Sequence, residues 1–463
     1  MNRLLISAAH KSSGKTTLSI GLCAAFRQQG SVVQPFKKGP DYIDPMWLGQ
    51  AAGRPCHNLD FYTMAHEEIL RTLHQQASGA DLALIEGNKG LYDGLDIEGS
   101  NSNAALARLT STPVILVIDV QGMTRGIAPL ILGYQAFDPK LHIAGVIFNQ
   151  IRGDRHEAKL RAVVEHYTDV PVVGAVHHEA SLAITERHLG LIPSNENREA
   201  VDKIDAIGQR IAEQVDLERL RDIARQAPAL TGGETLAPTT APAPDVRIGI
   251  ARDEAFGFYY PGDLDALQAA GAELVPFDTL HDRQLPPVDG VFIGGGFPES
   301  RLAELAANAP LREAIQTAIE AGLPTYAECG GLMYLCRQIT WQNETQPMVG
   351  VIEADVVMHP RPQGRGYVRL RETPDSPWPA DDRPAGDEFP AHEFHYSSLE
   401  NLAGAQRFAY DVLRGTGIDG KHDGLVYKNL LACYAHLRDT DYHHWARRFV
   451  ALIRHHKANG IAV

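Results

Sequence analysis

The chain has 463 residues, of which 44% are hydrophobic and 22% charged, and this composition is typical of a globular protein. Its length exceeds what one hydrophobic core usually supports, so we expect two domains. The formal net charge of −14 argues against nucleic acid as a partner. The apolar N-terminal stretch ends too early for a signal peptide, and no apolar run is long enough to cross a membrane. We therefore expect a cytoplasmic protein with no membrane partner.

Cysteine and histidine patterns argue against a disulfide framework and a zinc site. The five cysteines are scattered and form no C-x-x-C pair. The 20 histidines include no H-E-x-x-H motif, and the run HEFH at 392–395 is one residue short of it. We expect no transition metal.

A stretch without hydrophobic periodicity divides the sequence into near-equal halves. Residues 226–244 are rich in Pro, Ala, Thr and Gly and are predicted to form an exposed linker. We expect one domain over 1–225 and a second over 245–463. Both alternate short apolar runs with helical patterns, which indicates parallel sheets with crossover helices. The predicted fold class is α/β, with two doubly wound domains.

The predicted elements are short apolar runs and the helical patterns between them. In the first domain, buried strands are expected at 4–6, 82–85, 114–118, 143–148 and 172–176, with a helix over 18–29. In the second, they are expected at 246–251, 273–277, 291–293 and 324–326, then within 348–358 and 430–434. The last helix is predicted over 442–455.

The loop between the first predicted strand and helix has the features of a phosphate-binding loop. It reads AAHKSSGKTT, and its end, Gly14-Lys15-Thr16, matches the end of a P-loop. Backbone N–H groups at a helix N-terminus bind phosphate, Lys15 adds positive charge, and Thr16 can hold Mg²⁺. Ala9 replaces the first glycine of the motif, so a capped helix start remains the alternative. The predicted nucleotide contacts are Ser12, Ser13, Gly14, Lys15, Thr16 and Thr17.

Acidic residues follow two strand ends, where ligands of open α/β sheets collect. Asp41 and Asp44 stand in the run KKGPDYIDP, and Glu86 opens a glycine-rich turn. Mg²⁺ prefers oxygen ligands and usually takes only one or two carboxylates from a protein. Each acid alone could equally be a helix cap or a turn residue. Together with the P-loop they predict a metal–nucleotide site formed by Thr16, Asp41, Asp44 and Glu86.

A second reactive group is predicted in the back half. The sequence YAECGGL, residues 326–332, predicts a strand, a sharp turn and then a helix. This is a nucleophile elbow with Cys329 where hydrolases carry serine. The helix N-terminus is expected to lower the pKa of the thiol, because the helix dipole favours the thiolate. A buried core thiol is the alternative, and the flanking glycines argue against it.

A thiol nucleophile also needs a base and donors for an oxyanion. His436, at the end of a late strand, is the predicted base, with His392 and His395 as competitors. No acidic third member of a triad stands near His436 in the sequence. The predicted oxyanion hole consists of backbone N–H groups at Gly295, Gly296 and Gly330.

Several longer blocks carry a resemblance to a known family. They are FKKGPDYIDP (36–45), EGNKGLYDG (86–94), ERHLGLIPS (186–194), ARDEAFGFYYP (251–261), GGGFPE (294–299), AECGGLMYL (327–335) and HEFHYS (392–397). Almost end to end, the chain resembles cobyrinic acid a,c-diamide synthases. In that family a dethiobiotin-synthetase-like ATP-binding domain is fused to a class I, triad-type glutamine amidotransferase domain. The resemblance implies a P-loop NTPase-like first domain and a flavodoxin-like second domain.

The resemblance implies a carbon–nitrogen ligase that amidates the a- and c-side-chain carboxylates of a polycarboxylate tetrapyrrole. Cys329, with His436 as base, would release ammonia from L-glutamine. ATP and Mg²⁺ would convert a substrate carboxylate into an acyl phosphate, which ammonia then attacks. By position, the three acids match family residues of metal binding or carboxylate activation. Substrate contacts are expected from Lys37, Lys38, Tyr42, Lys89 and Tyr92, and a homodimer is one expected assembly.

Two alternatives stay open. Some relatives amidate siroheme or sirohydrochlorin, one of them in association with dissimilatory sulfite reductase. The departures HKSS (10–13) and Asn88-Lys89 near the synthetase site favour that branch. The second alternative is a non-enzymatic nucleotide switch of the partitioning type, whose signature lysine is replaced here by His10.

Lys38 and Lys89 could contact substrate carboxylates or be solvated surface charges.

Overall fold

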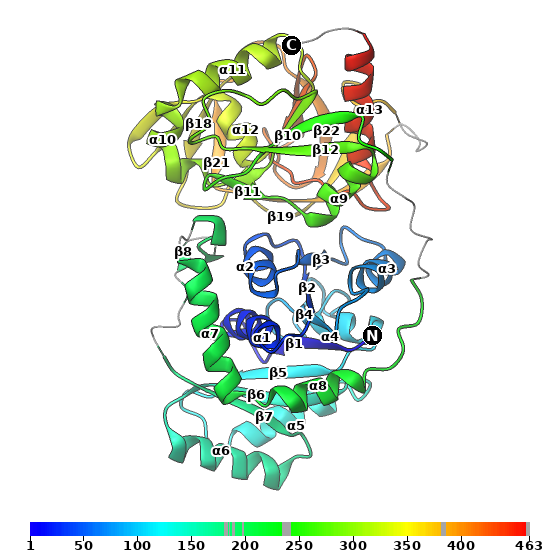
Figure 1. Cartoon of the computed structure of the whole chain (residues 1–463), viewed down its shortest axis with the longest axis vertical. Helices are drawn as coiled ribbons and strands as arrows, with labels where there is room; N and C mark the ends of the chain where they lie inside the picture. Colours follow the sequence, from blue (N-terminus) through cyan, green and yellow to red (C-terminus); the bar gives the residue numbers. More distant parts are fainter. Residues whose placement is uncertain are drawn as a thin grey trace. The chain divides into compact units, whose positions relative to one another are not determined.

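The computed structural model describes the chain except for residues 180–183, 185, 188–189, 197–198, 234–241, 381–385 and 460–463. It divides into two compact units, Met1–Ala237 and Pro238–Val463 (Figure 1). The predicted linker, 226–244, includes this division, but its boundaries stay a prediction because 234–241 lie outside the described residues. Part of the block at 186–194 also lies outside them. No described helix is long and apolar enough to cross a membrane.

Unit 1 is built on a seven-stranded sheet whose neighbours all pair in parallel. In spatial order the strands are β3 (His57–Leu59), β2 (Val33–Lys38), β4 (Leu82–Glu86), β1 (Arg3–Ala8), β5 (Val114–Asp119), β6 (Ile143–Ile151) and β7 (Val172–His177). The carboxyl ends of parallel strands lie at the same edge of a sheet, so the loops that follow them meet there. A separate small pair is formed by β8 (Glu186–Arg187) and β9 (Gly190–Leu191).

Helices cover both faces of this sheet. On one face, three helices pack on one another: α1 (Lys15–Gln28), α2 (Ile43–Ala52) and α7 (Ala200–Gln214). Four others share one core cluster with the strands: α3 (His66–Gln76), α4 (Asn103–Leu109), α5 (Ile127–Phe137) and α6 (Asp154–Tyr167). After the short turn η2 (Ser194–Glu196) and α7, α8 (Leu217–Arg225) packs on β1. The predicted doubly wound arrangement is therefore confirmed for the first half.

Unit 2 contains a nine-stranded sheet that is only partly parallel. Its order is β12 (Ala272–Phe277), β10 (Val246–Ala251), β13 (Gly290–Ile293), β15 (Thr325–Glu328), β24 (Leu430–Cys433), β23 (His422–Tyr427), β22 (Arg407–Arg414), β19 (Gly364–Glu372) and β20 (Glu388–His395). The first five strands are parallel, as predicted. The other four pair antiparallel and were not predicted. In β20 buried and more exposed residues alternate regularly, so this strand lacks a continuous apolar run.

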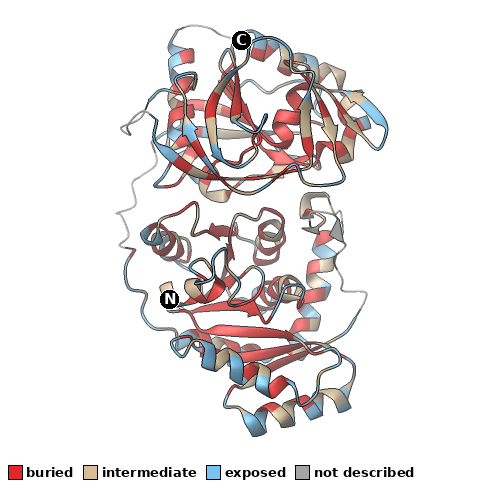
Figure 2. Cartoon of the chain, turned by 180° about the vertical axis from the view of Figure 1, so that it is seen from behind, coloured by how far each residue is buried: buried red, intermediate tan, exposed pale blue. Residues whose placement is uncertain are grey.

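Further elements pack around this sheet. A second sheet has the order β17 (Glu344–Pro347), β16 (Cys336–Trp341), β18 (Ile352–Met358) and β21 (Ser397–Glu400), and β11 (Phe256–Phe258) pairs with β14 (Gly295–Gly296). The helical elements are α9 (Pro261–Ala269), η3 (Pro298–Arg301), α10 (Leu302–Ala307), α11 (Ala309–Glu320), α12 (Gly330–Leu335) and α13 (Trp445–Ala458). Two core clusters form, one with α10 to α12 and the other with α9 and α13. Figure 2 shows the buried residues concentrated in the strands and on the helix faces toward them.

Candidate functional site

The predicted phosphate loop joins β1 to α1, and its backbone is shaped by Gly14. This glycine precedes α1 with a φ of 80°, in the left-handed region that glycine favours. Asn149, near the end of β6, donates from Nδ2 to the carbonyl of Ser13 at 2.9 Å. Ser13 in turn donates from Oγ to the carbonyl of His10 at 2.8 Å. The six predicted nucleotide contacts, 12–17, therefore form one braced turn at the N-terminus of α1.

Gly14→Ala is expected to destabilise this turn more than an ordinary glycine substitution would. The new Cβ would lie 2.0 Å from Nδ2 of Asn149, which could move only by giving up its bond to Ser13. Gly30→Ala is the matched control, because its φ of 85° is equally strained and no atom lies within 4 Å of its Cβ. We expect Gly14→Ala to lose roughly 1–2 kcal/mol more unfolding free energy than the control, measured by denaturant unfolding. It should also bind nucleotide more weakly, and equal losses in both variants would contradict this account.

Charged side chains from the ends of β2 and β4 and from the starts of α1 and α2 meet beside Thr16. Nζ of Lys37 lies 2.5 Å from Oδ2 of Asp44 and 3.1 Å from Oε1 of Glu86. Oγ1 of Thr16 lies 2.7 Å from Oε1 of Glu86 and 3.3 Å from Oδ2 of Asp44. Nζ of Lys15 lies 3.7 Å from the same Glu86 oxygen. The structure thus brings Thr16, Asp44 and Glu86 together, with Lys37 between the two carboxylates.

The charges of this cluster depend on one another. Burial lowers the pKa of Lys15. Burial also acts to lower the pKa of Lys37, but the carboxylates of Asp44 and Glu86 raise it above its ordinary value. Burial acts to raise the pKa of Asp44, and Lys37 more than offsets this, so the net shift is downward. At neutral pH, Lys37 and Asp44 therefore form a charged pair.

The oxygen atoms of the cluster fit Mg²⁺. Oε2 of Glu86 is buried and has no hydrogen-bond partner among the described residues. Thr16, Asp44 and Glu86 provide hard oxygen ligands, and Mg²⁺ commonly takes only one or two carboxylates from the protein and the rest from phosphates and water. In the described part of the chain, no group of three or more His, Cys, Asp or Glu could hold a metal. The arrangement suits a metal that binds together with a nucleotide.

Asp41, the fourth predicted metal ligand, has a different set of contacts. Its Oδ1 accepts hydrogen bonds from the N–H groups of Ile43 at 2.9 Å and Asp44 at 3.3 Å, at the start of α2. Burial raises its pKa to about 7. The structure therefore gives Asp41 the contacts of a helix cap, and its role as a metal ligand stays a prediction.

The predicted substrate contacts differ in exposure. Lys38 is buried and donates to Oδ1 of Asn88 at 3.0 Å, so it is not the solvated surface charge that was one alternative. Burial lowers its pKa to about 8. Lys89 is exposed, with a φ of 43°. Tyr42 is buried directly before α2, and the Tyr92 hydroxyl donates to a backbone carbonyl of α5 at 2.6 Å. Their contacts with substrate stay predictions.

Two asparagines were missed by sequence reasoning. Asn149 braces the phosphate loop, as described above. Asn103 is buried at the start of α4 and donates from Nδ2 to the carbonyls of Asn88 at 2.5 Å and Gly90 at 3.0 Å. It therefore holds the turn that follows Glu86. The only signal was an amide side chain beside an apolar run, which is too common to indicate a site.

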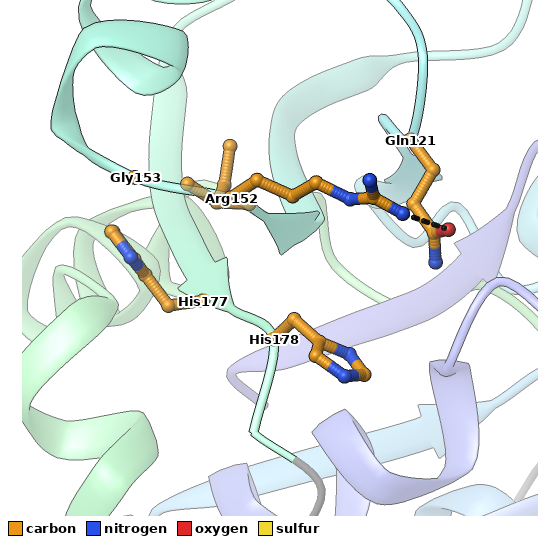
Figure 3. Close-up of a pocket in the computed structure, with 6 residues that line it drawn as sticks. Gln121, Arg152, Gly153, His177 and His178 are labelled. Carbon is orange, nitrogen blue, oxygen red and sulfur yellow. Dashed lines mark hydrogen bonds between the residues drawn. The ribbon is translucent and has the colours of Figure 1, made fainter.

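A pocket of about 390 Å³ lies at the carboxyl ends of β5, β6 and β7 (Figure 3). It is lined by Gln121, Ile151, Arg152, Gly153, His177 and His178. Arg152 extends toward Gln121, with Nη2 3.4 Å from Oε1. Because β6 also carries Asn149, the pocket lies next to the strand that braces the phosphate loop. No sequence motif indicated it.

In unit 2, Cys329 stands at a sharp turn between β15 and α12. Its φ of 46° and ψ of −100° are rare for a residue other than glycine. Its N–H donates to the carbonyl of Cys433 at 2.7 Å, which ties the turn to β24. The residue is only 7% exposed, and Sγ lies 3.9 Å from the carbonyl oxygen of Phe394. The structure thus has the strand–turn–helix geometry of a nucleophile elbow.

His436 and the predicted oxyanion glycines lie around this turn. Because β24 runs parallel to β15, the residues after the two strands come to the same edge. A Cβ on Gly295 would lie 2.6 Å from Cε1 of His436, and a Cβ on Gly330 would lie 2.9 Å from the carbonyl oxygen of Gly296. These close approaches require glycine. The structure therefore gathers Cys329, His436 and the three glycines, while their roles in catalysis stay a prediction.

The two competing histidines are engaged elsewhere in the described structure. The backbone of His392 pairs with that of His436, whose N–H donates to the His392 carbonyl at 2.7 Å. His395 stacks on Tyr434 with ring centroids 3.8 Å apart, and its Nδ1 lies 2.8 Å from the carbonyl oxygen of Ser397. Both histidines therefore support the segment that carries His436.

The predicted lowering of the thiol pKa is wrong. Burial raises the pKa of Cys329, because the thiolate would lose its hydration. α12 has only six residues, so its dipole is small. Burial, followed by the nearby His395, lowers the pKa of His436 to about 3. The site therefore rests with a neutral thiol and a neutral imidazole.

Comparison with known proteins assigns each unit to a family. Residues 5–191 match the CobQ/CobB/MinD/ParA nucleotide binding domain, and residues 247–440 match the CobB/CobQ-like glutamine amidotransferase domain. The chain is similar to a cobyrinate a,c-diamide synthase of Magnetococcus marinus, at 45% identity over 96% of this chain and 95% of the relative. A second one, of Methanosarcina acetivorans, is 42% identical over 97% of this chain and 94% of its own. A third, of Dehalococcoides mccartyi strain CBDB1, is 40% identical over 97% of this chain and 98% of the relative. The family predicted from the sequence blocks is confirmed, and the chain belongs to the cobyrinate a,c-diamide synthases.

Proposed function

We propose that the chain uses ATP and L-glutamine to amidate the a- and c-side-chain carboxylates of cobyrinate, the substrate named for its relatives. The observation that carries the proposal is the presence of two complementary sites in one chain. Unit 1 has a phosphate loop with converging carboxylates, and unit 2 has a thiol turn beside an imidazole. The first arrangement suits phosphoryl transfer, and the second suits release of ammonia from an amide.

In unit 2, Sγ of Cys329 adds to the amide carbon of glutamine while its proton passes to His436. The N–H groups of Gly330 and of the 295–296 turn stabilise the resulting oxyanion. His436 then returns the proton to the leaving nitrogen, so ammonia departs and a glutamyl thioester remains. Water attacks the thioester and releases glutamate and the thiol, which completes the cycle.

In unit 1, a carboxylate oxygen of the substrate attacks the γ-phosphorus of ATP, which gives an acyl phosphate and ADP. The N–H groups of the phosphate loop and Lys15 orient the phosphates. Thr16, Asp44 and Glu86 would hold Mg²⁺, which would neutralise phosphate charge. The pocket around Arg152 and Gln121 would accept the nucleoside. Ammonia then attacks the acyl carbon, phosphate leaves, and an amide is formed.

The identity of the macrocyclic substrate can be tested directly. Siroheme or sirohydrochlorin is the second candidate, because Asn88 pairs with Lys38 and Lys89 stands exposed beside them, near the proposed synthetase site. We would incubate the chain with ATP, Mg²⁺ and glutamine and follow cobyrinate, sirohydrochlorin and siroheme by mass spectrometry. Conversion of cobyrinate alone supports the proposal, and conversion of a sirohydrochlorin-type macrocycle alone supports the alternative. ATP hydrolysis with no change in any macrocycle would instead support the nucleotide switch.

We also propose a cytoplasmic homodimer that uses no nucleic acid. The net charge of −14 disfavours binding to a phosphate backbone. Sedimentation of the chain with and without duplex DNA tests the dimer and the absence of DNA binding.

A further inference from the structure

An acidic side chain reaches His436 from a strand that is distant in sequence. Glu328 is the last residue of β15 and lies directly before Cys329. It is in register with Cys433 of β24, three residues before His436. Its Oε2 lies 3.4 Å from Nδ1 of His436, and the two side chains are only 2% and 4% exposed. We propose that Glu328 is the positioning residue of the thiol site: its carboxylate holds Nδ1 of His436 as the protonated nitrogen and leaves Nε2 to accept the thiol proton.

The other carboxylate oxygen is fixed, which aims Oε2 at the imidazole. Oε1 accepts a hydrogen bond from the hydroxyl of Tyr326 and another from the N–H of Leu437, the latter at 2.9 Å. Leu437 follows His436 directly, so Glu328 is bound to the same stretch of backbone as the imidazole. Tyr326 itself is packed between Phe292 and Trp445, with ring centroids 5.0 and 4.8 Å away. The carboxylate therefore has little freedom to turn away from His436.

The geometry assigns a tautomer to the imidazole. A neutral histidine carries its proton on one ring nitrogen, and the partner of that nitrogen decides which one. An ionised carboxylate only accepts hydrogen bonds, so Nδ1 must be the protonated nitrogen when it faces Glu328. Nε2 then has the free lone pair that a general base needs. After it takes the proton from Cys329, the imidazolium faces a negative charge at 3.4 Å.

Burial makes this arrangement dependent on pH. It raises the pKa of Glu328 to about 8, so the carboxyl group holds a proton below that pH. A protonated carboxyl group donates to Nδ1, which leaves the proton on Nε2 and removes the base. The fraction of competent sites therefore grows as pH rises through about 8. The titratable groups that face this pair include Tyr326 on the same strand, Cys433 on β24, His395 on β20, Asp263 on α9, Tyr259 between β11 and α9, and Cys329.

Glu328→Gln tests the proposal with a side chain of the same size. The amide can still accept the bonds from Tyr326 and Leu437, so the fold should be retained. We expect the kcat of glutamine hydrolysis to fall about 10²–10⁴-fold, the usual contribution of a correctly placed general base. The KM for glutamine and the rate with ammonium should change little. The rise in kcat near pH 8 should disappear, because the amide side chain at position 328 does not titrate in this pH range.

Asp423→Asn is the matched control. Asp423 is equally buried and accepts the N–H groups of Tyr434 at 3.0 Å and Ala435 at 2.8 Å, directly before His436. It supports the same segment but does not contact the imidazole of His436 through the Glu328 carboxylate. If Glu328 had a purely structural role, both variants should therefore show the same change in stability and in pH profile. We expect Asp423→Asn to lower stability but to keep the rise near pH 8.

Tyr326→Phe covers the case in which Glu328→Gln does not fold. The tyrosine hydrogen bond acts to lower the pKa of Glu328, so its loss should move the rise in kcat to higher pH. An unchanged pH profile in Glu328→Gln or in Tyr326→Phe would overturn the inference. The inference rests on the proposed hydrolysis of glutamine, but different results would refute the inference and the proposed function. An unmodified chain that cannot hydrolyse glutamine refutes the function, whereas a Glu328→Gln variant that hydrolyses it normally refutes only the positioning role.

Discussion

Cys329→Ala should lose glutamine-dependent amidation, by about 10³-fold or more, and should keep amidation that is supplied with ammonium. Without Sγ no thioester can form, whereas free ammonia needs no thiol. Alanine meets the same backbone strain as cysteine at a φ of 46°, so the turn should be preserved. The measurement is product mass and ADP release, with glutamine or with an ammonium salt as the nitrogen source.

Cys336→Ala is the control for this prediction. Cys336 is fully buried in the core of the same unit, and its Sγ contacts the carbonyl of Leu332 at 3.3 Å. Both nitrogen sources should support activity in this variant. Retained glutamine-dependent activity in Cys329→Ala would remove the thiol from the mechanism.

Lys37→Met should be the most damaging change in unit 1. It removes the cation that lies 2.5 Å from Asp44 and 3.1 Å from Glu86, and it leaves the buried carboxylate of Glu86 near the partly exposed one of Asp44. Breaking a buried ion pair from one side costs about 3–5 kcal/mol of unfolding free energy. Added Mg²⁺ should recover part of this loss, because a ligand that binds only the folded state stabilises it. Thermal and denaturant unfolding with and without Mg²⁺ would measure both effects.

Lys38→Met separates this effect from the loss of any buried lysine. Lys38 is also buried, but its Nζ bonds to Asn88 and not to the two carboxylates. We expect a smaller loss, about 1–3 kcal/mol, and no stabilisation by Mg²⁺ beyond that of the unchanged chain. A Mg²⁺ effect of the same size in both variants would argue against a metal held by Asp44 and Glu86.

The features that could be predicted from the sequence are local in the chain. The phosphate loop and the Cys329 turn each combine a strand, a tight turn and a helix within about a dozen residues, so their signals are contiguous. The central parallel strands were predicted because burial on both faces produces continuous apolar runs. The strand β2 was implied only by the acidic residues that follow it, because it ends in Lys37 and Lys38, which sequence patterns place in solvent and the structure buries.

The features that could not be predicted depend on tertiary contact. Glu328 stands beside the predicted nucleophile, but its relation to His436 exists only through the register of β15 and β24. The direction of the Cys329 pKa shift depends on burial, which no local motif reports. Asn103 and Asn149 act through bonds to loops more than ten residues away in sequence.

The pairing of β15 with β24 also orders the events of folding. Residues 325–328 contact residues 430–433, so about a hundred residues must be synthesised and their loop closed before this pair can form. During synthesis the thiol at 329 therefore exists for some time without the imidazole at 436. The reactive centre of unit 2 can be assembled only after the antiparallel strands between them have emerged from the ribosome, so its appearance marks a late stage in the maturation of the chain.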